Sequence, residues 1–128
     1  MGDTRYKILL IEDDGIDQQS FKRFVETENL PYDCTIAGTI ADARTSLTTS
    51  QPFDIIISDY SLGDGAIIDI TDLIGDTPVI FVTGASNEDT AVKAVASACA
   101  YLVKDFNQNY LKALPEIIDT TLKHKHVT

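Results

Sequence analysis

One stretch of the chain decides its fold: Phe53-Asp54-Ile55-Ile56-Ile57-Ser58-Asp59-Tyr60-Ser61-Leu62. Three consecutive β-branched isoleucines follow Phe53 after a single polar residue, without the polar alternation of a strand that has one wet face. Such a run is typical of a strand that helices cover on both faces. Asp59 comes where this strand leaves the sheet. Ligands gather at the carboxyl ends of strands in open parallel sheets, so we expect Asp59 to bind a cation or to act as a nucleophile.

The composition indicates one domain of 128 residues, 1–128, with enough apolar material (44% hydrophobic) for a core. A formal net charge of −10 argues against direct binding to nucleic acid or to anionic membranes. Neither a spanning run of about 20 apolar residues nor a secretory segment at Met1–Lys7 is present. Cys34 and Cys99 lie far apart and in no motif, which favours reduced thiols and a cytoplasmic protein.

Apolar runs alternate with helical patterns along the whole chain. Besides the central stretch, the runs predict strands at residues 6–11, 32–37, 79–82 and 101–103. Apolar residues at three- and four-residue steps predict a helix after each strand: between Gly15 and Asn29, from Thr39 to Gln51, a short one from about Ala66 to Ile74, one from Ser86 or Asn87 to Ala98, and one from Tyr110 to about His124. Residues 61–65 are expected to form a loop.

Five strand–helix alternations predict an α/β fold with a doubly wound, five-stranded parallel sheet and right-handed crossovers. The flavodoxin-like strand order 2-1-3-4-5 is the favoured one, with a shortened third helix. The first and third strands are then neighbours. Glu12 and Asp13 follow the first strand and Asp59 follows the third, so these acids should converge on one crevice.

Three converging carboxylates repel one another by ~1–4 kcal/mol per contact, depending on the local dielectric. Proteins keep such clusters when a cation fills them or when a carboxyl group needs a raised pKa for its chemistry. A site with only a few oxygen ligands from the protein suits Mg²⁺. At the ends of the next two strands, Thr83 offers a hydroxyl and Lys104 a mobile ammonium. Together with Glu12, Asp13 and Asp59, these groups suit formation of an aspartyl-phosphate and stabilisation of a transferring phosphoryl group.

Four motifs, in order and over nearly the whole chain, resemble those of the receiver domain of two-component response regulators. They are Ile8-Leu9-Leu10-Ile11-Glu12-Asp13-Asp14, Asp54 to Leu62, Pro78-Val79-Ile80-Phe81-Val82-Thr83-Gly84 and Tyr101-Leu102-Val103-Lys104-Asp105-Phe106. The resemblance implies that Asp59 is the phosphoacceptor and takes its phosphoryl group from a histidine kinase or a histidine phosphotransfer protein.

The resemblance also implies a Mg²⁺ site formed by Glu12, Asp13, Asp59 and the backbone carbonyl of Ser61. Lys104 would pair with the phosphoryl group.

Two further residues would form the switch. Thr83 would bond a phosphoryl oxygen and shift, and Tyr101 would change rotamer in response, which alters the face formed by the fourth helix, fifth strand and fifth helix. Such a domain is a signalling switch and not a turnover enzyme. The downstream effector protein or fused domain, and any homodimer, stay open.

Several positions depart from the family pattern. The segment between Asp59 and Thr83 is shorter than usual, so the third helix must be short or distorted. Gly63 replaces the usual Pro, and Ser97 replaces the usual Gly before the fifth strand. Asp105 replaces a Pro that usually follows a cis peptide bond; because a cis bond before a residue other than Pro costs ~2.5–4 kcal/mol, we expect a trans bond and a reshaped loop.

Purely structural interpretations of the same residues remain open. Asp59, Thr83 and Lys104 could simply end their strands. Glu12 and Asp13 could be acids favoured by a helix dipole, and Tyr101 could be half-buried packing.

Two functional alternatives stay open as well. One is a degenerate receiver that acts as a phosphorylation-independent protein-interaction module. The other is a phosphatase of the haloacid-dehalogenase type, although that family needs an acid where Ser61 stands.

Overall fold

The computed structural model describes residues 5–49, 52–59, 61–83, 98–105 and 109–127. Five parallel strands form its main sheet in the spatial order β2-β1-β3-β6-β7. This is the predicted 2-1-3-4-5 order when the strands of this sheet are counted along the chain. Their bounds are β1 Tyr6–Ile11, β2 Tyr32–Ala37, β3 Ile55–Ser58, β6 Val79–Thr83 and β7 Ala98–Val103.

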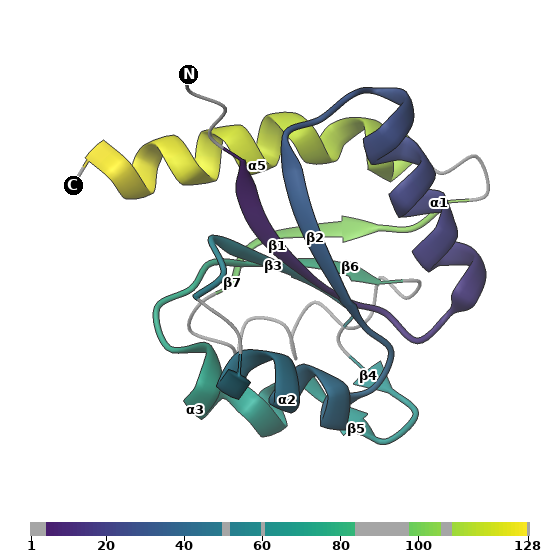
Figure 1. Cartoon of the computed structure of the whole chain (residues 1–128), viewed down its shortest axis with the longest axis vertical. Helices are drawn as coiled ribbons and strands as arrows, with labels where there is room; N and C mark the ends of the chain where they lie inside the picture. Colours follow the sequence, from purple (N-terminus) through teal and green to yellow (C-terminus); the bar gives the residue numbers. More distant parts are fainter. Residues whose placement is uncertain (1–4, 50–51, 60, 84–97, 106–108, 128) are drawn as a thin grey trace.

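Helices cover both faces of this sheet (Figure 1). The helices α1 (Gly15–Thr27) and α5 (Asn109–Val127) lie on one face. The helix α2 (Ile40–Thr49), the 3₁₀ turn η1 (Ile67–Ile70) and the single-turn helix α3 (Thr71–Ile74) lie on the other. The doubly wound α/β fold predicted from the sequence is therefore confirmed.

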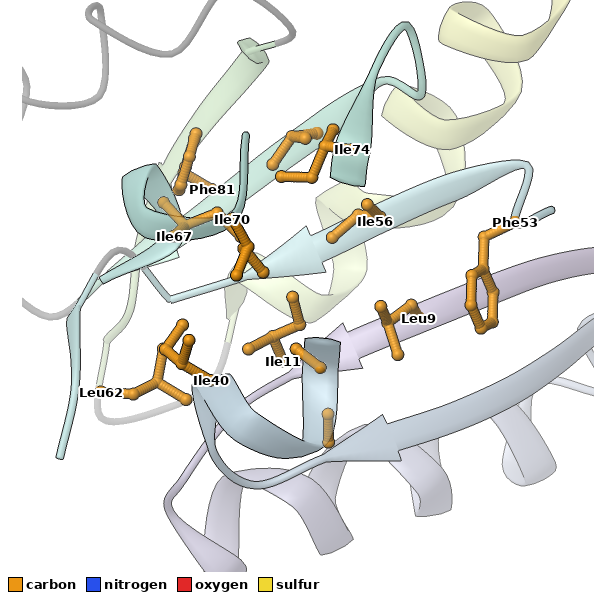
Figure 2. Packing of buried hydrophobic residues seen from close by; sticks show 13 residues of the cluster. Leu9, Ile11, Ile40, Phe53, Ile56, Leu62, Ile67, Ile70, Ile74 and Phe81 are labelled. Carbon is orange, nitrogen blue, oxygen red and sulfur yellow. The ribbon is translucent and has the colours of Figure 1, made fainter. Parts of the chain in front are cut away.

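The strand β3 is buried on both faces, which explains its uninterrupted isoleucines. Ile55 and Ile57 pack with the residues of α1 and α5, whereas Ile56 packs on the opposite side. Figure 2 shows that second cluster, in which the sheet side chains meet residues of α2, η1 and α3: Leu9, Ile11, Ile56 and Phe81 from the sheet, and Ile40, Ile67, Ile70 and Ile74 from the helices. Alternate strand residues thus feed two apolar layers.

Local sequence signals set the ends of α1. The side chain of Asp14 accepts hydrogen bonds from the backbone N–H groups of Ile16 (2.8 Å) and Asp17 (3.1 Å), as an N-cap residue does. Just after the helix, Asn29 adopts a left-handed conformation with φ of 53°. Asn tolerates this region better than most residues, and the chain then enters β2.

The segment after Asp59 differs from the sequence prediction. Residues 61–65 were expected to form a loop, but Ser61–Leu62 (β4) and Gly65–Ala66 (β5) pair as a small antiparallel hairpin. The carboxylate of Asp64, at its tip, accepts hydrogen bonds from the backbone N–H groups of Ile40 (2.8 Å) and Ala41 (3.1 Å). This contact with the start of α2 holds the segment in an ordered form that local sequence did not reveal.

The sequence predicted a short third helix from about Ala66 to Ile74, and the structure has a short helical segment there. It consists of one 3₁₀ turn, η1, followed by one α-helical turn, α3. Gly65 begins the segment with φ of 155°, and a Cβ there would lie 2.9 Å from a carboxylate oxygen of Asp69. The positive φ therefore favours glycine where the hairpin meets this turn, and a larger residue would also displace the Asp69 side chain.

The strand β7 begins earlier than predicted. The sequence placed Ala98 in a helix and started the strand at Tyr101, but the strand runs from Ala98. Its register against β6 shifts, with Val79 opposite Ala98 and Ile80 opposite Ala100. Pairing with β6 outweighs the helix propensity of alanine there. The rest of the predicted fourth helix, from Ser86 or Asn87 onward, lies outside the described residues.

The helix α5 begins at Asn109, one residue before the prediction, and continues through Pro115. Leu114, Ile118 and Leu122 form its buried face, as predicted. Among the residues that the structure describes, no peptide bond is cis, so the bond before Asp105 is trans as expected. No described helix is both long and apolar enough to cross a membrane.

Candidate functional site

The parallel pairing of β1 and β3 brings three acids together at the carboxyl edge of the sheet. Ile11 is in register with Ser58, and the N–H of Asp59 donates to the carbonyl of Ile11 at 3.0 Å. One carboxylate oxygen from each of Glu12, Asp13 and Asp59 lies within 4.8 Å of the other two. The convergence expected from the strand order is thus present in the structure, and the separation of the oxygens is short enough for one cation to contact all three.

Glu12 is the buried member of this acid cluster, with 4% of its surface exposed. One carboxylate oxygen accepts from the backbone N–H of Asp14 at 3.1 Å, and the other accepts from Lys104. Burial raises the pKa of Glu12 and the charge of Asp59 acts in the same direction, while the hydrogen bonds from Lys104 and Asp14 and the charge of Lys104 lower it. Burial prevails, and a nearby divalent cation would favour the ionised form.

Lys104 reaches into the cluster from the end of β7. Its ammonium lies 2.7 Å from Glu12, 2.8 Å from Asp17 and 3.4 Å from Asp59, measured from Nζ to the nearest carboxylate oxygen. Burial lowers the pKa of Lys104, but hydrogen bonds to Asp17 and Glu12 and the charges of Glu12 and Asp59 raise it more, so its pKa lies above the usual value. The lysine is therefore charged at neutral pH in this site.

Asp17 is a site residue that sequence reasoning missed. It lies in the first turn of α1, three residues after the capping Asp14. Side chains in a helix lean toward its N-terminus, so an acid at this position faces the strand ends. The acidic first turn was visible in the sequence, but its meeting with Lys104 depends on where β7 ends in space.

For the remaining predicted site residues, the structure gives positions on the strands but fewer side-chain contacts. Thr83 ends β6 and pairs in register with Val103, while its side chain lies outside the described part of the chain. Ser61 opens β4, two residues after Asp59. Tyr101 pairs with Phe81 and packs, half-buried, against the apolar cluster on the α2 side of the sheet.

Asp105 has a definite structural role. Its carboxylate accepts hydrogen bonds from the backbone N–H groups of Asn109 (2.7 Å) and Tyr110 (3.4 Å), the first residues of α5. The acid that replaces the family's usual Pro therefore caps the last helix. The sequence predicted a reshaped loop here but not this cap.

A family model for the response regulator receiver domain matches residues 8–115. The chain therefore belongs to the response regulator receiver domain family, whose members serve phosphorylation-dependent signalling in general.

Individual relatives agree with this assignment. The chain is 28% identical over 125 residues to the response regulator protein PilR of Pseudomonas aeruginosa, covering 94% of this chain and 27% of PilR. It is 29% identical over 112 residues to the cell cycle transcriptional regulator CtrA of Caulobacter vibrioides, covering 84% of this chain and 47% of CtrA. The chain thus spans about half or less of these relatives.

A solved structure shows the same fold. The CheY-like response regulator receiver domain protein from Methanospirillum hungatei superposes with a TM-score of 0.79 at 26% identity, covering 96% of this chain and 98% of that one. The family match favours a receiver over the dehalogenase-type phosphatase that the sequence left open.

Proposed function

We propose that this chain is a receiver domain over residues 1–128 that accepts a phosphoryl group on Asp59. The donor would be the phosphohistidine of a histidine kinase or of a histidine phosphotransfer protein. The observation that supports this most strongly is the meeting of Glu12, Asp13 and Asp59 within 4.8 Å, with the ammonium of Lys104 3.4 Å from Asp59. A carboxylate nucleophile, a cation site and a positive charge would then surround the position of the transferred phosphoryl group.

The donor set fits Mg²⁺, which prefers a few oxygen ligands and keeps several waters. Glu12, Asp13 and Asp59 would hold the ion together with the backbone carbonyl of Ser61. When bound, the ion would neutralise charge on the phosphoryl oxygens. This role also accounts for a cluster of three acids whose mutual repulsion the single positive charge of Lys104 offsets only in part.

The chemistry assigned to the chain is a single displacement at phosphorus. A carboxylate oxygen of Asp59 forms the new O–P bond while the P–N bond of the phosphohistidine breaks, and its electron pair stays on the imidazole, which takes up a proton. Lys104 would then pair with a phosphoryl oxygen, and Thr83 would bond another. Charge stabilisation and positioning suffice for such a transfer, because its transition state is loose.

The proposed switch would carry the signal from the site to the face that includes β7 and α5. Thr83 and Tyr101 stand on neighbouring strands, β6 and β7, one site residue on each. We propose that phosphorylation shifts the threonine and the tyrosine together. The partner that binds this face would be an effector protein, a fused domain or a second copy. In this proposal the chain acts in the cytoplasm.

A degenerate receiver is the second candidate. The contacts of Lys104 with Glu12 and Asp17 are shorter than its contact with Asp59, and Asp105 is committed to capping α5. A domain whose lysine stays with these acids would serve as a constitutive interaction module.

Intact-mass measurement after incubation with acetyl phosphate and Mg²⁺ separates the two candidates. We expect the wild-type chain to gain one phosphoryl group, and expect no gain in Asp59→Asn or when EDTA removes the metal. A wild type that gains nothing, or an Asp59→Asn variant that gains as much, rules out the phosphoacceptor proposal. If the wild type also fails to bind Mg²⁺ in a titration, the interaction module is the better account.

A further inference from the structure

We propose that Asp17 is a positioning residue that competes with the phosphoryl group on Asp59 for the ammonium of Lys104. This inference rests on the proposed function. It adds to that function a residue that sets the strength of the interaction between Lys104 and the phosphoryl group. Asp17 would act through Lys104 and not through contact with the phosphoryl group.

The first support is the geometry of the lysine. Its ammonium carries three N–H donors, and three carboxylates accept from it. Asp17 at 2.8 Å is a closer partner than Asp59 at 3.4 Å. In this state the lysine is therefore held more by α1 than by the proposed phosphoacceptor.

The second support is the partial burial of this ion pair. The side chains of Lys104 and Asp17 are 17% and 22% exposed, respectively. Water screens such a pair less than it screens an exposed one, so the attraction is larger than that of a typical surface salt bridge. By comparison, the ion pair of Lys123 and Asp119 on α5 is 74% and 51% exposed.

The third support is the anchoring of Asp17. Its backbone N–H donates to the capping carboxylate of Asp14 at 3.1 Å, in the first turn of α1. The lysine has a flexible four-carbon stem and can reorient. The acid thus has a short side chain on an anchored backbone, whereas the ammonium is carried on a long, movable stem, which is the arrangement that competition requires.

The consequence follows from linkage. A phosphoryl group that draws Lys104 away from Asp17 must offset the lost ion pair, and this weakens its own binding. Replacing Asp17 with Asn removes the charge and keeps the shape. We expect the affinity of Asp17→Asn for a phosphoryl analogue to exceed that of the wild type by roughly threefold to tenfold. This range lies between the effects of exposed and of buried ion pairs.

The competition can be measured with beryllofluoride, a stable analogue of a phosphoryl group on a carboxylate. Its affinity is determined by ¹⁹F NMR at saturating Mg²⁺ for the wild type, Asp17→Asn and the matched control Asp14→Asn. The control removes an acid from the same turn, and Asn retains the ability to cap α1. We expect a severalfold gain for Asp17→Asn and a clearly smaller gain for Asp14→Asn.

Equal gains in the two variants would mean that only the general negative field is reduced, and no gain in Asp17→Asn would mean no competition; either result overturns the inference. Circular dichroism melting of each variant verifies that α1 stays folded. If the wild type itself fails to bind beryllofluoride with Mg²⁺, the proposed function fails. If the wild type binds and the two variants behave alike, only the role of Asp17 fails.

Discussion

Lys104 stands among acids that would otherwise repel one another. Its ammonium contacts Glu12, Asp17 and Asp59, and the side chain is mostly buried. Removing one partner of such a group leaves buried charges without compensation. The lysine should therefore contribute to the stability of the metal-free protein as well as to the proposed chemistry.

The variant Lys104→Met tests this contribution. We expect the free energy of unfolding to fall by about 1.5–3 kcal/mol in the presence of EDTA, the size of a hydrogen bond to a charged group, as measured by urea denaturation. The matched control is Lys123→Met, whose ion pair with Asp119 is exposed; its effect should stay within about 0.5 kcal/mol. Equal losses in the two variants would show that the burial of Lys104 does not matter.

The pH dependence of the same difference has a definite sign. The pKa of Lys104 is raised in the folded state because, against the effect of burial, its hydrogen bonds and charged neighbours favour the cation. Its stabilising contribution is thus complete below the unfolded pKa of about 10.4. It is lost as the pH rises through the higher folded value. The difference in unfolding free energy between wild type and Lys104→Met should be constant near pH 8–10 and shrink above that range; an increase there would contradict the assignment.

At this scale the sequence predicted the meeting of Glu12, Asp13, Asp59 and Lys104, because each follows a strand and parallel strands end at one edge. Asp17 could not be predicted in the same way. Its partner is far away in the chain, and the contact depends on the direction in which α1 leaves β1. The cap formed by Asp105 was missed for a related reason, since it depends on where α5 begins.

Among the secondary-structure elements, the hairpin β4–β5 links the candidate site to α2. Asp64 at its tip accepts hydrogen bonds from the first N–H groups of α2, Ile40 and Ala41. These hydrogen bonds lower the pKa of Asp64 despite its exposure. The hairpin also contains Gly63, where the family usually has the more rigid Pro. In this chain the hydrogen bonds of Asp64 with the start of α2 hold the hairpin in place instead.

Asp64→Ala should lower the urea midpoint of the wild type without changing the slope of the transition, because α2 loses a capping carboxylate while the surface exposed on unfolding stays similar. Asp76→Ala, in the exposed turn before β6, is the matched control and should leave the midpoint nearly unchanged. An unaltered midpoint in Asp64→Ala would show that the hairpin does not stabilise α2.

The elements that the sequence misplaced are those formed by pairing or capping across the chain. Long apolar runs predicted β1, β3 and β6 well, because burial on both faces leaves a clear signal. The hairpin β4–β5 consists of two-residue strands, too short for any periodicity to show. The early start of β7 depends on its bulged register with β6, which local helix propensity cannot reveal.

Across the whole molecule, the sheet separates two apolar layers, and α5 closes one of them. Ile118 of α5 is fully buried in that layer, whereas Ile16 of α1 is 75% exposed. Ile118→Ala should lower the free energy of unfolding by about 2–5 kcal/mol through lost burial and a residual cavity. Ile16→Ala should change it by less than about 0.5 kcal/mol. Similar losses in urea denaturation would contradict the arrangement of the layers.

The central claim is that the carboxylate of residue 59 is the one that takes the phosphoryl group, and its most direct test is to locate that group chemically. After incubation with acetyl phosphate and Mg²⁺, borohydride reduces an aspartyl-phosphate to homoserine, and tandem mass spectrometry of peptides then identifies the modified residue. We predict homoserine at position 59, and only when both donor and Mg²⁺ are present. Homoserine at Asp13 or at another acid instead, or at none, would contradict the account.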